Sequence, residues 1–196
     1  MIFEEKKITL KDGRTAVLKS PCVEDAEKML EYIKKASGET DFLTRYPEEW
    51  EIDVEQEKKW IESLRSSNDN MGIACYVDGD LAGHCDIRYK TNMKDGHRAV
   101  LGIALLKEYW NLGIGSAMFS ELIAEAEKYD IEILELQFVE GNDRARHLYE
   151  KFGFTIVAEL PNAFKLRDGT YLSEIFMQKY LPRFYQKNEE YRTSYL

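Results

Sequence analysis

Two glycines ahead of an apolar helix are the first residues of this chain whose types and spacing indicate chemistry. The apolar run from Ala99 to Leu106 predicts a buried strand, and the segment from Trp110 to Ser116 leads from it into an amphipathic helix. The first N–H groups of a helix have no intrahelical acceptors, so those of Leu112 to Ser116 would point at one spot. Gly113 and Gly115 would let an anion approach the main chain because they have no Cβ. The segment therefore predicts a phosphate site.

By itself this glycine pair is equally compatible with a tight turn between a strand and a helix. It is not a Walker loop, because no Gly-Lys-Ser/Thr follows, and it lacks the third glycine and the downstream acid of the dinucleotide fingerprint. A second element, Asn142 to Phe154, reads NDRARHLYEKFGF. Its apolar residues recur at i, i+3, i+4 and i+7, which predicts a helix with one buried face that includes Tyr149.

With both elements, the chain resembles the GNAT superfamily of N-acetyltransferases over about residues 8 to 179. The first motif is matched by Trp110-x-x-Gly113-x-Gly115, with tryptophan where members of the family often have glutamine or arginine. The second motif, N-x-x-A-x-x-L-Y-x-x-x-G-F, is matched in full from Asn142 to Phe154. The resemblance implies an α/β fold whose mixed, mostly antiparallel sheet is splayed at a cofactor cleft and carries helices on both faces. It also implies acetyl-CoA as the co-substrate.

The resemblance further implies roles for individual residues. Main-chain groups of Ala104, Leu105 and Leu106 would meet the pantetheine arm, and a backbone N–H would polarise the thioester carbonyl. Asn142 would hydrogen-bond the pantetheine, and Tyr149 would be the general acid for the leaving thiolate. A phenol with a pKa of about 10 can protonate a thiolate of pKa about 8.5 when both are held in a dry cleft. The pyrophosphate would lie on Leu112, Gly113, Ile114, Gly115 and Ser116. For Tyr149, a core aromatic is the alternative reading.

The acceptor amine must also lose a proton. An ammonium group with a pKa of about 10.4 is neutral only about once in a few thousand molecules at pH 7. The candidate bases are Glu39, Asp41, Asp86 and His97, and each could instead be a solvated surface group or a cap. Members of the family often have a glutamate on the central strand, but residues 97–101 contain none. We favour Glu39, because it falls in the loop expected to cover the acceptor.

Other clusters carry less chemistry. His84 and Cys85 are neighbours in a predicted strand, so they point to opposite faces and cannot pair. The histidines lack metal-ligand spacing with the cysteines, so no metal site is expected. Arg146 and Lys151 could lie near the 3′-phosphate of CoA, or could be solvated charges of a helix.

The elements that must position these residues follow from hydrophobic periodicity and from Asp-Gly turns. A long ordered loop is expected at residues 37–50. Helices are expected from residue 23 to about 36, at 54–66, after the glycine pair, and at 144–152. Strands are expected at 8–10, 15–18, 72–77, 81–89, 99–106, 133–139, 164–167 and 171–177.

Composition limits the class of protein. The 196 residues, of which 44% are hydrophobic, predict one domain over residues 1–181 and a polar, tyrosine-rich extension over 182–196. A net charge of -9 disfavours nucleic acid and anionic membranes as partners and favours a cationic amine. Three widely spaced cysteines indicate reduced thiols and the cytoplasm. No apolar run approaches the roughly 18 residues that span a bilayer, and the start lacks the features of a signal peptide.

The sequence thus predicts an acetyl-CoA-dependent N-acetyltransferase that acts on a small cationic metabolite or antibiotic by direct attack in a ternary complex. A CoA-binding sensor without turnover, a mononucleotide-binding protein and an enzyme for protein amino termini stay open. The 182–196 segment is expected to be mobile, or to pack on the partner subunit of a homodimer.

Overall fold

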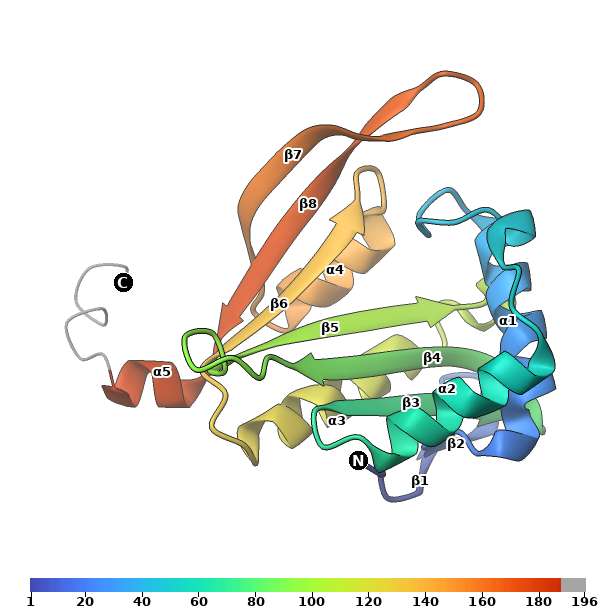
Figure 1. Cartoon of the computed structure of the whole chain (residues 1–196), viewed down its shortest axis with the longest axis horizontal. Coiled ribbons are helices and arrows are strands. Elements are labelled where there is room, and N and C mark those ends of the chain that lie inside the picture. Colours follow the sequence, from blue (N-terminus) through green and yellow to red (C-terminus); the bar gives the residue numbers. More distant parts are fainter. Residues whose placement is uncertain (188–196) are drawn as a thin grey trace. The chain divides into compact units, whose positions relative to one another are not determined.

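The computed structural model describes residues 1–187 (Figure 1). The chain divides into two compact units. Unit 1 comprises residues 1–87 and 102–120, and unit 2 comprises residues 88–101 and the chain from 121 onward. The strands form one sheet in the order β1-β2-β3-β4-β5-β6-β8-β7. The pairings of β1 with β2, β2 with β3, β6 with β8 and β7 with β8 are antiparallel, whereas β5 and β6 are parallel. The predicted mixed, mostly antiparallel sheet is confirmed.

The chain passes between the units within β4, β5 and α3. Unit 1 contains β1 (Lys6–Thr9), β2 (Thr15–Lys19), η1 (Val23–Asp25), α1 (Ala26–Glu39), η2 (Pro47–Glu49), α2 (Val54–Ser66), β3 (Asn70–Val77) and η3 (Lys107–Tyr109). The elements that cross are β4 (Asp80–Tyr89), β5 (Arg98–Leu105) and α3 (Ile114–Glu127). Unit 2 contains β6 (Ile133–Val139), α4 (Asp143–Lys151), β7 (Thr155–Lys165), β8 (Tyr171–Tyr180) and α5 (Pro182–Lys187).

Close packing in unit 1 leaves no room for a side chain at Gly72. A Cβ on Gly72 of β3 would lie 2.6 Å from Cδ2 of Leu64 and 2.7 Å from Nε2 of His84. Gly72 therefore lets α2 and the His84 ring lie directly against β3. The start of α2 is fixed by a reciprocal cap, in which the Asp53 carboxylate accepts the Gln56 N–H at 2.8 Å and the Gln56 amide oxygen accepts the Asp53 N–H at 3.0 Å.

The structure corrects two predicted boundaries. Helix α1 continues to Glu39, so the first residues of the expected 37–50 loop are helical. The Ser37 hydroxyl is buried and accepts the indole N–H of Trp50 at 2.9 Å, which holds the shortened loop against the helix. Strand β7 is 11 residues long instead of the predicted four, because its residues are mostly exposed and no buried face imposes an alternating pattern.

The first residues of the tyrosine-rich extension form α5. The rings of Tyr180 and Phe184 lie 4.5 Å apart, and Arg183 pairs with Asp130. Residues 188–196, the rest of the predicted extension, lie outside the described part of the chain. No helix among residues 1–187 combines the length and the apolar character needed to cross a membrane.

The pairing of β5 with β6 stops early in both strands. Its register covers only Arg98 to Val100 and Ile133 to Glu135, although both strands continue. At the last pair, the Glu135 carboxylate accepts hydrogen bonds from Arg98 and from Gln178 Nε2 (2.8 Å) and forms an ion pair with Lys90 (2.9 Å). Burial alone would raise the pKa of Glu135, but these donors outweigh it and hold the pKa below its ordinary value.

We expect the Glu135→Gln variant to lose stability in a pH-dependent way. Because the folded-state pKa lies below the unfolded value of about 4.3, the carboxylate contributes its stability above that pH and loses it as the pH falls. The variant should be less stable than wild type by about 1 kcal/mol at pH 7, since both cations are partly exposed and screened. Urea unfolding at pH 7 and pH 3.5, with Glu4→Gln as an exposed control, checks this. A difference that stays the same at both pH values would contradict it.

Candidate functional site

The segment before α3 turns sharply. Asn111 and Gly113 have φ angles of 64° and 95°, in the left-handed region that favours glycine. The Lys11 N–H donates to the Leu112 carbonyl at 3.1 Å and holds the turn. The Ala117 N–H donates to the Gly113 carbonyl at 3.1 Å, so the amides before Ala117 belong to the first helical turn, which has no intrahelical acceptors. The structure thus places Leu112 to Ser116 at the positive end of α3.

Trp110 stands where the GNAT motif often has glutamine or arginine, and its side chain makes a hydrogen bond within the fold. Its indole N–H donates to the Leu105 carbonyl at 2.9 Å. This bond ties the segment before α3 to the end of β5. The tryptophan therefore fixes the distance between two parts of the predicted site.

Side chains of α1 hold the end of β5 and the start of η3. The Tyr32 hydroxyl donates to the Ala104 carbonyl at 2.7 Å and accepts the His84 N–H at 3.2 Å. One carboxylate oxygen of Glu39 accepts the Lys107 N–H at 2.7 Å. The Ala104 carbonyl, one of the main-chain groups near the expected pantetheine site, therefore already has a partner within the fold.

The direction of each backbone group follows from the contacts with β4. The Leu106 N–H donates to the Ala82 carbonyl at 3.0 Å, and the Lys90 N–H donates to the Arg98 carbonyl at 3.0 Å. The backbone N–H and carbonyl groups of the even-numbered residues from 98 to 106 therefore point toward β4. Those of Leu105 point away from β4, because the direction of the backbone groups alternates along a strand. Since the Leu105 carbonyl accepts the Trp110 indole, its N–H is the group left to act at that edge.

The four candidate bases lie in different surroundings. Glu39 ends α1 and is half-buried, with one oxygen on the Lys107 N–H. Asp41 is exposed in the loop after α1. His97 precedes β5 and is seven residues from Ala104, about 23 Å along an extended strand. The structure therefore does not bring His97 to the end of β5.

Asp86 lies on β4, and its carboxylate lies beside Gly102 of β5. It is half-buried on β4, and its Oδ1 is 2.8 Å from the position that a Cβ on Gly102 would take. The carboxylate thus occupies space left by a missing side chain on β5. It makes no hydrogen bond or ion pair with any side chain that the structure describes. Burial raises the pKa of Tyr32, and the negative charges of Asp86 and Glu39 raise it further, which indicates that these groups lie near one another.

Cys85 and His84 precede Asp86 on β4. Cys85 is buried, and burial raises the pKa of its thiol. The His84 ring meets Trp60 edge-on at 5.9 Å, and its Nε2 is buried without a hydrogen-bond partner among the described residues. Burial lowers the pKa of His84, so it is neutral at pH 7. Within residues 1–187, no three His, Cys, Asp or Glu side chains gather as a metal site.

The remaining site residues lie in unit 2. The Asn142 amide oxygen caps α4 by accepting the Ala145 N–H at 3.2 Å, which leaves the Nδ2 group as its donor. The Tyr149 side chain is buried, and its ring lies 5.8 Å from Phe138 and 6.3 Å from Phe154. Burial raises the pKa of Tyr149, so the phenol keeps its proton at physiological pH.

The two cations proposed for the CoA 3′-phosphate both have neighbours close by in the sequence, on α4 or directly after it. Arg146 forms an ion pair with Glu150 at 2.8 Å, and Lys151 lies 5.7 Å from the centre of the Phe152 ring. Both are exposed, in keeping with solvated helix charges.

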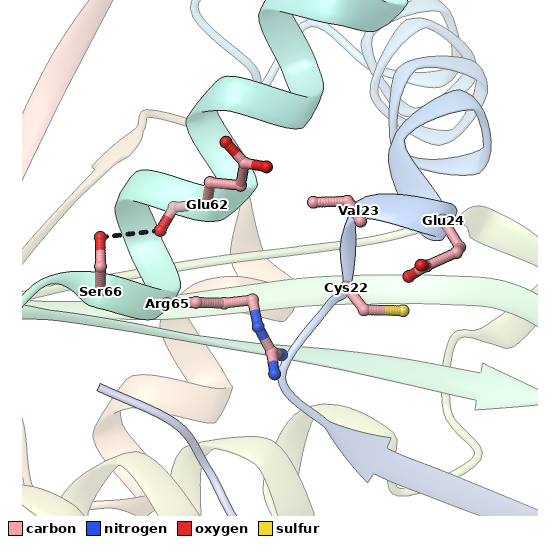
Figure 2. A pocket seen from close by; sticks show the side chains of 6 residues that line it. All are labelled: Cys22, Val23, Glu24, Glu62, Arg65 and Ser66. Atoms are coloured by element: carbon pink, nitrogen blue, oxygen red, sulfur yellow. Dashed lines mark hydrogen bonds between the residues drawn. The ribbon is translucent and has the colours of Figure 1, made fainter.

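A separate pocket of about 450 Å³ lies between η1 and α2, and Figure 2 shows its lining. Arg65 donates to the Pro21 carbonyl at 2.9 Å, and the Cys22 thiol donates to the Asp25 carboxylate at 3.0 Å. Burial, followed by the acidic neighbours, raises the pKa of Cys22 to about 11, so the thiol is unreactive at neutral pH. None of the predicted site residues lines this pocket, which is formed by Cys22, Val23, Glu24, Glu62, Arg65 and Ser66.

Comparison with known proteins decides the family. The family model "Acetyltransferase (GNAT) family" matches residues 36–154, which include both motifs. The chain belongs to the GNAT family of acetyltransferases. An L-amino acid N-acetyltransferase of Escherichia coli is 27% identical over 61% of this chain and 74% of its own length. A probable spermine N(1)-acetyltransferase of Bacillus subtilis subsp. natto is 29% identical over 55% of this chain and 74% of its own length.

Solved structures of the GNAT fold align with most of the chain. A GNAT acetyltransferase of Streptococcus pneumoniae has a TM-score of 0.79 and 24% identity, covering 85% of this chain and 99% of that one. The acetyltransferase yncA of Salmonella typhimurium, solved with acetyl-CoA, has a TM-score of 0.73 and 17% identity, covering 85% and 94%. At these identities the likeness establishes the fold.

Proposed function

We propose that this GNAT acetyltransferase moves the acetyl group of acetyl-CoA to a primary amine of a small cationic metabolite or antibiotic, in a ternary complex. The observation that carries the proposal is the start of α3, where Gly113 turns the chain and the first-turn amides have no intrahelical acceptors, an arrangement that suits an anion. The acetyl-CoA in one structural neighbour supports the choice of co-substrate. Relatives named for amino acids and spermine support an amine acceptor.

In this proposal the chain holds acetyl-CoA mainly through backbone groups. The amides of Leu112, Gly113, Ile114, Gly115 and Ser116 bind the pyrophosphate. Ala104, Leu105 and Leu106 line the pantetheine arm, and the Leu105 N–H polarises the thioester carbonyl, because it alone of the three points away from β4. Asn142 contributes the Nδ2 donor that its capping contact leaves over.

Tyr149 is the proposed general acid. The neutral amine nitrogen forms a bond to the carbonyl carbon, the C–S bond breaks, and the phenol gives its proton to the thiolate. The phenolate then recovers a proton from the nitrogen of the new amide. Burial raises the pKa of the phenol, so it holds its proton until the thiolate forms, and a thiolate that forms in the same dry surroundings has a raised pKa as well.

For the proton of the ammonium group, the structure adds a reason to choose Asp86 over Glu39, the residue that the sequence favours. Glu39 already accepts a hydrogen bond from the Lys107 N–H. Asp86 is half-buried with no hydrogen-bond or ion-pair partner among residues 1–187. A carboxylate without a charged partner attracts a cation more strongly when it is partly buried. Asp86 would therefore bind the ammonium group of the acceptor and then take its proton.

An assay of CoA release with a panel of amines tests the proposed function. We expect turnover with at least one cationic metabolite, such as a polyamine, an amino-acid amide or an aminoglycoside, and none with neutral alcohols. A panel in which every amine is inert while acetyl-CoA still binds would support the sensor reading instead. Turnover only with peptides bearing a free amino terminus would redirect the enzyme to proteins.

A further inference from the structure

Helix α1 contacts the chain at two points, one at the end of β5 and one at the start of η3. Tyr32 holds the Ala104 carbonyl and Glu39 holds the Lys107 N–H, at 2.7 Å in both cases. The two side chains are seven residues apart, which places them on the same face of the helix, about 10.5 Å apart along its axis. Ala104 and Lys107 are three residues apart, about 10 Å in an extended chain. The spacing of the two side chains along α1 therefore matches the spacing of Ala104 and Lys107 along the segment from β5 to η3.

The Tyr32 contact falls on one paired position of the sheet. Ala82 with Leu106 and Lys90 with Arg98 define an antiparallel register in which His84 is opposite Ala104. The phenol bonds to both members of this pair, since it accepts the His84 N–H and donates to the Ala104 carbonyl. The hydroxyl is buried and its pKa is raised by burial, so it stays protonated and keeps both contacts over the working pH range.

The backbone between the two contacts carries the group proposed to act on the thioester. Leu105 lies between Ala104 and Lys107, and its carbonyl is held by the Trp110 indole. The Leu105 N–H belongs to the same peptide group as the Ala104 carbonyl, which Tyr32 holds. The Leu105 carbonyl and the Lys107 N–H are also bonded, so this peptide group has little freedom to rotate. Hydrogen-bond donors stabilise a developing oxyanion best when they are fixed in advance.

We propose that Tyr32 and Glu39 are positioning residues, through which α1 fixes the direction of the Leu105 N–H. The inference rests on the proposed function for the role of that N–H, but the bracing itself is a property of the fold. Neither side chain touches the thioester, and both act through the backbone that they hold. Glu39 then serves as a hydrogen-bond acceptor, for which a neutral amide oxygen is sufficient.

Tyr32→Phe tests the first contact. We expect kcat to fall about 10-fold with little change in the KM for the amine, because one donor of the oxyanion site loses its alignment. Amide exchange at residues 104–107, followed by mass spectrometry, should become at least several-fold faster. Tyr89→Phe is the matched control, because its hydroxyl is buried but makes no hydrogen bond within the described chain.

Glu39 separates positioning from proton transfer. Glu39→Gln keeps an oxygen for the Lys107 N–H and should keep most of kcat, whereas Glu39→Ala should lose about as much as Tyr32→Phe. The double variant Tyr32→Phe with Glu39→Ala should lose less than the product of the single losses, because both contacts brace one segment. An equal loss in Glu39→Gln and Glu39→Ala would overturn the positioning role and make Glu39 the base.

The two readouts keep this inference apart from the proposed function. If wild type turns over no amine, the proposed function fails, and the exchange measurement still tests the brace. Unchanged amide exchange in Tyr32→Phe would overturn the brace whatever the activity. Faster exchange with wild-type kcat would show a structural contact without the catalytic role and would also overturn the proposal.

Discussion

Replacing Tyr149 by phenylalanine is expected to lower kcat by about two orders of magnitude, the typical contribution of a general acid. The variant keeps the ring that packs against Phe138 and Phe154, so the fold and the affinity for acetyl-CoA should be nearly unchanged. Steady-state kinetics with the best amine of the panel, together with calorimetric titration of CoA, measure the two effects separately.

The control for this variant is Tyr129→Phe, which removes the hydroxyl of a partly exposed ring in the same unit. Burial raises the pKa of Tyr149, so deprotonation of this phenol cannot limit the rate near neutral pH. Wild-type kcat in Tyr149→Phe would contradict the acid role and leave the residue as a core aromatic.

Asp86→Asn is expected to lower kcat/KM by about 10²- to 10³-fold at pH 7, because the amide keeps the shape of the side chain but removes its charge and basicity. The loss should shrink as the pH rises, since more of the acceptor is then already neutral. A pH–rate profile of both proteins measures this, and wild type and variant should converge at alkaline pH.

Two matched variants separate Asp86 from the other carboxylates. Glu39→Gln should lose far less activity, and Asp41→Asn, at an exposed loop position, should behave as wild type. A larger loss in Glu39→Gln than in Asp86→Asn would show that the sequence-based choice of base was right.

The periodicity of the sequence was sufficient for the elements that are buried on one or both faces. Strand β6 and helix α2 have the predicted bounds, since their apolar residues recur at the period of their own structure. The exposed edge strand β7 and the last turn of α1 were underestimated. Ser37 and Gly38 resemble a helix stop in the sequence, but contacts with Trp50 and close approach of Pro47 hold them in the helix.

Some parts of the proposed site follow from local sequence, whereas others depend on contacts between distant parts of the chain. The turn at Gly113 and the cap at Asn142 are local, so the sequence could predict them. The roles of Tyr32 and Asp86 depend on the register between β4 and β5 and on the position of α1 along the strand. In the sequence Tyr32 is one more aromatic of an amphipathic helix, and only its hydrogen bonds to residues 52 and 72 positions away distinguish it from core.

A crystal structure of the complex with acetyl-CoA would show whether the start of α3 binds the pyrophosphate. We expect the pyrophosphate within hydrogen-bond distance of the backbone N–H groups of Gly113 to Ser116 and the thioester oxygen facing the Leu105 N–H. A complex in which the start of α3 stays empty while the ligand binds elsewhere on the chain would contradict it.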